Sequence, residues 1–415
     1  MVKKQMSESP LTFSFVDIRS RLRPDRLESR VRKRDKSRSI GHARPVIEES
    51  ALWLCRAQDA MEDGGLPGFY HLYTGWSAKA VEPTASAIPT MLSLAGVVPE
   101  FNMTKRAVRL GRAIRDDNHL AGLSSAKTII SENVTGLAWA VLGWIGVYAH
   151  TAKAAFKNTA ITTGVQLNHT CADRMLDRVV SVPQRAIITW ALECLFHLQP
   201  EKQFYRTAEA LGSSILGSCA ADGYPQGCTG ANGTDPALVY LAQTFRGLLE
   251  SGILSQNRSW IVAAYKGAQR LLESFQQQGT LAGRYGPGWR ADYSFNCMAG
   301  CAQTALLWLR LYQHGFAEEY FHAATQVARF ITSTIDTASP DPGIRGGIRA
   351  GYPLWIDYHP LAYSTMAAKL ALDVFLLLKK LSPPEIASQR LLLKRPAESG
   401  RPEGGTECRQ LPAGS

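Results

Sequence analysis

The sequence lacks two motifs that would place it in a well-defined class of enzyme. It has no Gly-x-x-x-x-Gly-Lys-Ser/Thr segment, which argues against the phosphate-binding loop of an NTPase. It has no Gly-x-Ser-x-Gly segment either, which argues against the nucleophile elbow of an α/β-hydrolase. Alternating polar and apolar runs do not repeat along the chain, so a β-sheet protein is disfavoured. These absences favour a protein that is built mainly of helices.

The chain also lacks the marks of a secreted or metal-stabilised protein. No apolar run of the signal-peptide type stands at the N-terminus, and the eight cysteines show no tight framework. Cys297 and Cys301 stand four positions apart, as two metal ligands could, but no second pair of Cys or His has a comparable spacing. We therefore predict a cytoplasmic protein with reduced core cysteines, no metal and no cofactor.

Most of the net charge of +11 belongs to the first 46 residues. Residues 1–46 hold 13 Lys and Arg against 5 Asp and Glu, whereas residues 47–384 hold 28 against 26. We predict that residues 1–46 form a disordered basic arm. Such an arm can contact an anionic membrane surface or nucleic acid, or it can have no partner. Between the two partners we favour the membrane surface, which would place the protein at the periphery of the inner membrane.

The body of the chain shows a helical pattern almost throughout. In "DPALVYLAQTFRGLLESG", Asp235 can cap a helix at its start and Gly252 can end it. Helices of two kinds alternate: residues 297–313 are apolar nearly all round, whereas residues 317–333 have one apolar face. A helix that is apolar all round must be covered on every side, so the alternation predicts an inner and an outer layer.

Glycine-rich or acidic breaks divide residues 47–380 into similar units. Successive breaks stand 51 to 64 residues apart, which is enough for two helices and two loops. The breaks lie at or near Gly64, Asp117, Ala172, Gly223, Gly279 and Gly343. A repeat of this size is typical of stacked supersecondary units. We therefore predict an all-α fold, an (α/α)6 toroid of six helical hairpins around a central cavity, followed by a Pro/Gly-rich disordered tail at 381–415.

Residues 133–152 form a segment that could be taken for a membrane span. They include no Asp, Glu, Lys or Arg over 20 positions, which is long enough to cross a bilayer. They also carry Asn133, Thr135 and His150, and a helix buried inside a large helical protein has the same pattern. We favour the buried helix.

Three segments carry a resemblance to a known family. "WLCRAQDAMEDGGLPGFYHLYTGW", "CMAGCAQTALLWLRLYQ" and "PGIRGGIRAGYP" resemble VpsJ-like polysaccharide-biosynthesis proteins, which are toroids of the terpenoid-cyclase and protein-prenyltransferase type encoded in bacterial exopolysaccharide gene clusters. Glu82 and Lys369 match residues of the family's motifs. The resemblance implies a toroid that binds or modifies a glycan, or its lipid-linked precursor, in the central cavity.

Two other interpretations stay open. A non-catalytic scaffold subunit of a polysaccharide-synthesis complex would also suit the basic arm. An isoprenoid cyclase or prenyltransferase would suit the fold and the aromatic residues, but the sequence has no Asp-x-Asp-Asp acid motif and no zinc ligand set. For an enzyme that acts on carbohydrate, lyase, hydrolase and epimerase chemistry all stay open.

Four residues are candidates for proton transfer. Glu82 follows the glycine-aromatic segment "EDGGLPGFYHLYTGW", and two carboxylates beside a cavity can act as acid and base on a sugar. Asp63, within that segment, is the second carboxylate, and we assign it to substrate binding. In "GYPLWIDYHP", Tyr352, Asp357 and His359 can supply a proton-transfer group and its orienting partner. The structural alternative is that these residues cap turns or line a loop packed on the barrel.

Aromatic and basic residues are the candidates for substrate binding. Trp76, Trp289 and Trp355 fall in predicted loops, and their flat faces suit sugar rings as well as ordinary packing. Arg185 and Arg246 interrupt apolar helices, where an arginine can bind a carboxylate or phosphate. A buried arginine can equally cap a helix or pair with a neighbouring acid.

Overall fold

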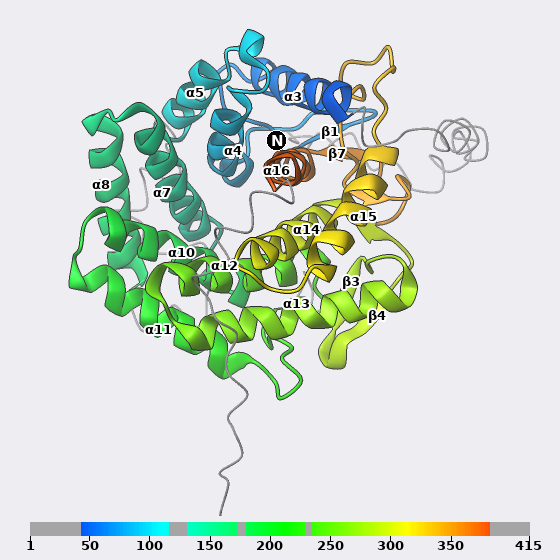
Figure 1. The fold of residues 1–415 in the computed structure, drawn as a ribbon. Coiled ribbons are helices and arrows are strands. Elements are labelled where there is room, and N and C mark those ends of the chain that lie inside the picture. Colours follow the sequence, from blue (N-terminus) through cyan, green and yellow to red (C-terminus); the bar gives the residue numbers. More distant parts are fainter. Residues whose placement is uncertain (1–42, 116–130, 172–179, 229–233, 382–415) are drawn as a thin grey trace, which may run out of the picture.

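A computed structural model describes residues 43–115, 131–171, 180–228 and 234–381 (Figure 1). Twelve α-helices lie within these residues, and they alternate along the chain between an outer and an inner position. The outer helices are α3 (Ala43–Asp59), α5 (Met103–Arg115), α8 (Ala154–Cys171), α11 (Lys202–Ser218), α13 (Arg258–Gln278) and α15 (Glu319–Ser333). The inner helices are α4 (Val81–Leu94), α7 (Ser131–Thr151), α10 (Val182–Leu198), α12 (Leu238–Ser255), α14 (Met298–Gln313) and α16 (Thr365–Lys380). Residues 1–42 of the predicted arm and 382–415 of the predicted tail lie outside the described residues.

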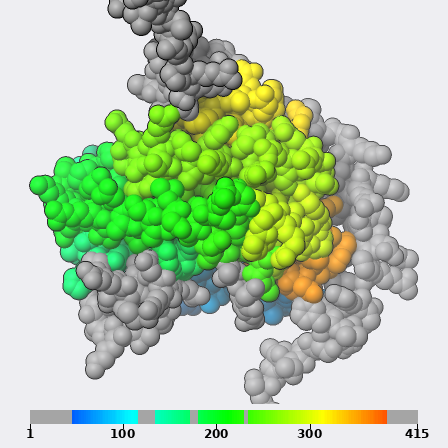
Figure 2. All heavy atoms as spheres, turned by 90° about the horizontal axis from the view of Figure 1, so that it is seen from below, coloured from blue at the N-terminus to red at the C-terminus, as the bar shows by residue number. Residues whose placement is uncertain are grey.

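The inner helices form a closed ring. Each packs against the next, from α4 through α7, α10, α12 and α14 to α16, and α16 packs against α4. The outer helices surround this ring, and the outer surface of α11 and α13 (green) faces the viewer in Figure 2. The predicted all-α toroid with two concentric layers is thereby confirmed.

Burial follows the two layers. Of the sixteen residues of α14, fourteen are buried, and the exceptions are Arg310 and Gln313. The outer helix α15 buries one face only, with Tyr320, Val327 and Ile331 among its buried residues. The reason is geometric: α14 packs between two inner helices and beneath α15, whereas α15 faces solvent on its far side.

The apolar segment at 133–152 lies in the inner helix α7. This helix packs against α4, α8 and α10, and these contacts account for its apolar surface. Within the parts of the chain that the structure describes, no helix is long and apolar enough to cross a membrane. The prediction of a buried helix is confirmed.

The ends of α12 differ from the prediction. Asp235 does not cap the helix; its two carboxylate oxygens accept hydrogen bonds from Nη2 of Arg290 at 3.0 and 2.9 Å. The backbone N–H of Leu238 instead donates to the carbonyl of Gly283 at 2.9 Å, so a neighbouring segment satisfies the donor that a cap would have served. Gly252 lies inside the helix rather than at its end.

The seven strands of the described residues all lie in segments that lead from an outer helix into the next inner helix. They are β1 (Phe69–His71), β2 (Gly75–Trp76), β3 (Arg284–Gly286), β4 (Arg290–Asp292), β5 (Asn296–Cys297), β6 (Gly351–Tyr352) and β7 (Ala362–Ser364). β1 pairs with β7 and β5 pairs with β6, so the segment before α16 is tied to those before α4 and α14. These segments share one end of the ring, where the inner helices begin, and we call it the strand end. Strands of two or three residues are too short to show alternation in a sequence.

Gly267 of α13 tests the packing between the two layers. A Cβ at this position would lie 2.2 to 2.4 Å from ring atoms of Phe245 on α12. Gly267→Ala is therefore expected to lower the free energy of unfolding in urea by about 1 to 3 kcal/mol, because a close-packed core shifts only with strain. The matched control is Gly217→Ala in α11, where the new methyl group meets no atom within 4 Å. That variant is expected to gain up to about 1 kcal/mol from helix propensity, and equal stabilities of the two variants would contradict the packing argument.

Candidate functional site

Six side chains, one from each inner helix, meet along the axis of the ring. They are Glu82 of α4, Trp139 of α7, Trp190 of α10, Arg246 of α12, Gln303 of α14 and Lys369 of α16, and we call them the axial cluster. Nζ of Lys369 lies 5.9 Å from the ring centre of Trp139, and Lys369 also interacts electrostatically with Arg246. In the ring, α16 packs between α14 and α4 and not against α7 or α12. These side chains therefore reach across the axis.

Glu82 and Lys369 are each held in place by a different partner. Glu82 lies half-buried in the first turn of α4, and its Oε1 accepts a hydrogen bond from Nε1 of Trp139 at 3.0 Å. Lys369 is buried and pairs with Asp373, with 2.8 Å from Nζ to Oδ2, while Thr90 donates to Oδ1 of Asp373 at 2.7 Å. Burial lowers the pKa of Lys369, although Asp373 and Glu82 favour its charged form. The lysine charge is thus compensated inside the ring.

The two tryptophans of the axial cluster pack against each other. The rings of Trp139 and Trp190 lie edge to face, with centres 6.3 Å apart and an angle of 76° between them. The guanidinium of Arg246 lies over Trp190, 5.6 Å from the ring centre. Nη1 of Arg246 donates to Oε1 of Gln303 at 3.5 Å, and its Nε lies 3.7 Å from Oε1 of Glu250. Contacts across helices hold each of these groups in place.

The axial cluster combines flat aromatic surface with hydrogen-bonding groups of both kinds. Glu82 and Gln303 can accept hydrogen bonds, whereas Arg246 and Lys369 can donate them. Ligand sites of proteins typically join such a small polar set to an apolar wall. No group of three or more His, Cys, Asp or Glu side chains that could hold a metal ion is found among the described residues.

A hollow of about 420 Å³ lies elsewhere, between α11 and α13. It is lined mainly by small apolar side chains, with Arg258 and Lys266 at its polar side. No residue of the axial cluster lines it, because it opens on the outer layer. We therefore place the candidate site in the ring and not in this hollow.

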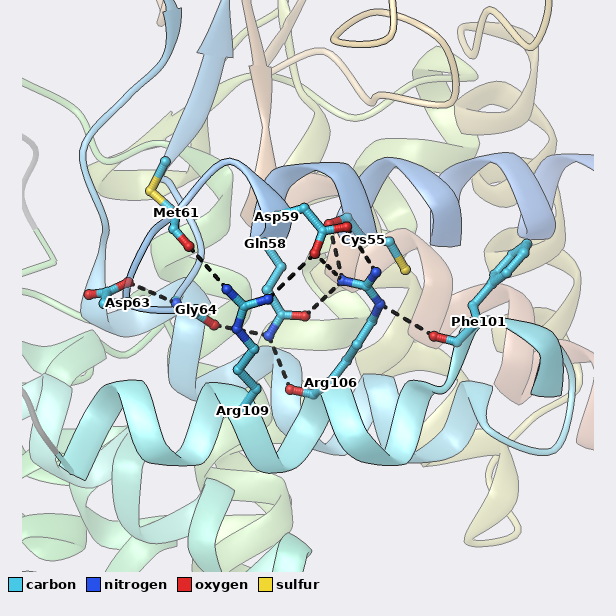
Figure 3. A network of polar contacts seen from close by, with 10 residues as sticks. Cys55, Gln58, Asp59, Met61, Asp63, Gly64, Phe101, Arg106 and Arg109 are labelled. Atoms are coloured by element: carbon cyan, nitrogen blue, oxygen red, sulfur yellow. Dashed lines mark hydrogen bonds and ion pairs between the residues drawn. The ribbon is translucent and has the colours of Figure 1, made fainter.

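Asp63 lies in the turn after α3, within the network of polar contacts that Figure 3 shows. Its carboxylate pairs with Lys79 at 2.7 Å and accepts a hydrogen bond from the N–H of Gly65 at 2.9 Å. Beside it, Nε2 of Gln58 donates to the carbonyl of Gly64 at 2.9 Å, which ties the turn to α3. These contacts stabilise the turn, and a role of Asp63 in substrate binding stays a prediction.

Arg185 points toward the outer layer. Its Nε donates to the carbonyl of Val180 at 3.0 Å, and its Nη1 lies 3.4 Å from Oγ of Ser214 on α11. The side chain thus links the start of α10 to its outer neighbour. Arg246, the other arginine considered from the sequence, is the one that belongs to the axial cluster.

Two of the three candidate tryptophans are packed against other rings. Trp76 lies 5.1 Å from Trp53 and 4.9 Å from Tyr70 between ring centres. Trp289 stacks on Phe245 at 6.1 Å with 18° between the planes. Both indoles are half-buried, so most of their faces serve packing at the strand end.

The loop between β6 and β7 carries the remaining candidates. Trp355, Asp357 and His359 are exposed on it. Tyr352, in β6, packs against Phe330 with ring centres 5.5 Å apart. Of the four predicted proton-transfer residues, Glu82 is therefore the one that joins the axial cluster.

Comparison with known proteins supports the toroid fold but assigns the chain to no family. No protein-family model and no curated protein sequence matches the chain. The crystal structure of an unsaturated glucuronyl hydrolase specific for heparin matches with a TM-score of 0.62 and 12% identity, over 82% of this chain and 98% of that one. Cellobiose 2-epimerase from Bacillus thermoamylovorans B4167 matches with a TM-score of 0.61 and 11% identity, over 80% and 97%. The chain has the fold of these sugar-processing enzymes.

A third match has the same character. A sugar epimerase from a ruminal bacterium matches with a TM-score of 0.60 and 10% identity, over 84% of this chain and 98% of that one. At such identities the likeness concerns the fold, and the residues of the axial cluster must be interpreted from their own chemistry.

Trp139, Trp190, Gln303 and Lys369 were not predicted as site residues. The predicted aromatic binding residues were all in loops, whereas these four residues lie inside inner helices. One signal was available: Arg246 and Lys369 are charged residues within apolar helices, and a buried charge requires partners nearby.

Proposed function

We propose that this chain binds a glycan, or the lipid-linked precursor of one, through the axial cluster and acts in polysaccharide biosynthesis. The observation that carries the proposal is the convergence of six inner helices on two indole faces, one carboxylate and two cationic groups. Sugars present both apolar ring faces and many hydroxyl groups, so they match aromatic walls with fixed donors and acceptors. The shared fold with enzymes of glucuronides and cellobiose adds support.

If the protein is an enzyme, Glu82 is the residue that we assign to proton transfer. Its Oε1 accepts a hydrogen bond from Nε1 of Trp139, which orients the carboxylate beside the aromatic rings of the axial cluster. Hydrolysis, elimination and epimerisation each need an acid or base at this place. Glu82 in turn favours the charged form of Lys369, so the cluster holds a carboxylate and an ammonium group near each other.

One observation favours a binding subunit without turnover as the second candidate. Glycoside hydrolysis generally uses two carboxyl groups. In the axial cluster and its partners, Asp373 is engaged by Lys369 and Thr90, and Glu250 is engaged by two arginines. Glu82 would then act alone, which suits recognition better than a two-carboxylate mechanism.

An isoprenoid ligand is less well matched to the same residues. Charged groups such as Arg246 and Lys369 lose hydration when hydrocarbon covers them, and the cost is large unless each is fully paired. The basic arm as a contact with an anionic membrane surface stays a prediction from charge alone.

The proposal is tested by isothermal titration calorimetry with cello-oligosaccharides and size-fractionated heparin oligosaccharides. Wild-type protein is expected to bind at least one of these series, and Trp190→Ala is expected to weaken binding at least ~10-fold, since a central Trp anchor contributes strongly to affinity. Tyr205→Ala, an exposed aromatic on the outer helix α11, is the control and should bind as wild type does. Absence of binding in both series, or full affinity in Trp190→Ala, would refute the axial site.

Glu82→Gln separates the two candidates. In an enzyme it is expected to retain binding and to reduce turnover about 10²- to 10⁴-fold, the usual contribution of a general acid or base. If wild-type protein binds the glycan but product analysis shows no turnover, the binding-subunit candidate is supported.

A further inference from the structure

Exposed aromatic side chains gather at the strand end of the ring. The large hydrophobic side chains exposed among the described residues are Tyr73, Val165, Tyr205, Tyr240, Tyr293 and Trp355. Four of the six lie in the segments before inner helices or in the first turn of one, and the other two lie on the outer helices α8 and α11. Scattered apolar residues need no explanation, but a set on one face indicates an interaction surface.

The loop between β6 and β7, which carries Trp355, contacts the β1–β2 hairpin, which carries Tyr73. The N–H of Leu72 donates to the carbonyl of Leu361 at 3.1 Å, next to Tyr73 in the hairpin turn. The ring of His359 lies 6.5 Å from that of Phe69 in β1. His359 is therefore a neighbour of the hairpin that carries Tyr73, and Trp355 is exposed on the same loop.

The same loop reaches the start of α12 on its other side. Tyr358 packs against Phe295 with ring centres 5.2 Å apart, and the guanidinium of Arg284 lies over its ring. Arg284 forms a β-bridge with Ala237, the residue before α12. The exposed residues Tyr73, Trp355, His359 and Tyr240 therefore lie on connected segments of the strand end, from the segment before α4 to the first turn of α12, and we call them the aromatic strip.

A charged group lies directly beside the strip. The guanidinium of Arg284 lies 5.8 Å from the ring centre of Tyr358, and its Nη1 donates to the backbone carbonyl of Asp235 at 2.8 Å. The axial cluster likewise combines aromatic faces with hydrogen-bond donors. A ligand with apolar faces and hydroxyl groups would therefore find the same kind of surface twice.

The strip and the axial cluster are joined by the inner helices. Tyr240 and Arg246 both belong to α12, and six residues of helix separate them by about 9 Å along its axis. Glu82 lies in the first turn of α4, at the strand end itself. The strip and part of the axial cluster therefore lie at the same end of the ring.

We propose that the aromatic strip binds further sugar rings of the same chain whose one end occupies the axial cluster. The substrate class is then a linear oligosaccharide or polysaccharide of several rings rather than a monosaccharide or disaccharide. This inference rests on the proposed glycan-binding function. It adds a length requirement, because each additional ring held on the strip contributes affinity.

The test compares ligand lengths. Calorimetry with cello-oligosaccharides and heparin oligosaccharides of two to six rings is expected to show affinity rising about tenfold from the shortest to the longest, as two added aromatic contacts would produce. In Trp355→Ala and in Tyr240→Ala, the ratio between longest and shortest is expected to fall below about threefold. The control Tyr205→Ala should keep the wild-type ratio, because this aromatic lies on α11.

The outcomes distinguish the two proposals. Equal affinity for all lengths, or a wild-type length ratio in both strip variants, would overturn the aromatic strip while leaving the axial site intact. Absence of binding at every length would overturn the proposed function and the strip with it. Circular dichroism of each variant checks that the helical fold is retained, and the two strip variants give independent readings.

Discussion

Glu250→Leu is expected to lower the free energy of unfolding by about 3 kcal/mol, because it leaves the half-buried guanidinium of Arg310 without its partner. Glu250 is buried on α12, and its two oxygens accept hydrogen bonds from Nε and Nη2 of Arg310 on α14, each at 2.7 Å. Arg246 also faces it, with Nε 3.7 Å from Oε1. Denaturation in urea at neutral pH measures the loss.

A double variant distinguishes lost pairing from lost packing. Replacing both partners of a buried ion pair by apolar groups of similar volume is often close to neutral. Glu250→Leu combined with Arg310→Met is therefore expected to recover most of the stability that Glu250→Leu loses. If the double variant is as unstable as the single one, the destabilisation comes from packing around Glu250 and the argument from unpaired charge is wrong.

The pH dependence of this pair has a defined direction. Burial raises the pKa of Glu250, but Arg310 and Arg246 lower it by more, so the net pKa lies below its ordinary value. The stabilising contribution is therefore present at neutral pH and is lost as the pH falls through the folded-state pKa.

Glu193→Gln is expected to stabilise the protein at pH 8 by up to about 3 kcal/mol. Glu193 of α10 has no exposed surface, and neither carboxylate oxygen has a hydrogen-bond partner among the described residues. Burial raises its pKa from 4.5 to about 7, with smaller effects of His197 and Glu209. Above that pH the folded protein must hold a buried charge, which glutamine removes while keeping the shape of the side chain.

The advantage of Glu193→Gln should depend on pH in the direction that its raised pKa dictates. Below the unfolded-state pKa of about 4.5 both states are protonated, so wild type and variant are equally stable. As the pH rises toward 7, the unfolded chain ionises first and wild type loses stability relative to the variant. Melting curves at pH 4, 6 and 8 measure this trend, with Glu100→Gln, at an exposed position, as control. A pH-independent difference would contradict a buried ionisable Glu193.

The helical hairpins could be predicted because their signals are local. The apolar pattern of residues 297–313 predicted an inner helix, and α14 is buried on nearly all sides. The end of a helix depends on its neighbours, and there the prediction was wrong: Asp235 pairs with Arg290, and the N–H of Leu238 is satisfied by Gly283. The local pattern around Leu238 carries no information about a hydrogen bond to Gly283, which lies 45 residues further along the chain.

The residues of the candidate site, like the helix ends, could be predicted only in part. Glu82 was predicted from the sequence because it follows a conspicuous turn, whereas Lys369 was noted only as a match to the family's motifs and not as a site residue. Trp139 and Trp190 gave no local signal, since a tryptophan in an apolar helix has the same surroundings whether it faces the axis or a neighbouring helix. The tertiary structure identified Trp139 through its contact with Lys369 on α16, which is not a neighbour of α7 in the ring, and Trp190 through its contacts with Trp139 and Arg246.

A ring of helical hairpins could be predicted from the sequence, since the hydrophobic period of each helix and the spacing of the breaks are both visible along the chain. Which side chains meet at the axis could be seen only in the packed fold. That outcome depends on the rotation of each inner helix about its own axis, which is set by the packing of both layers at once.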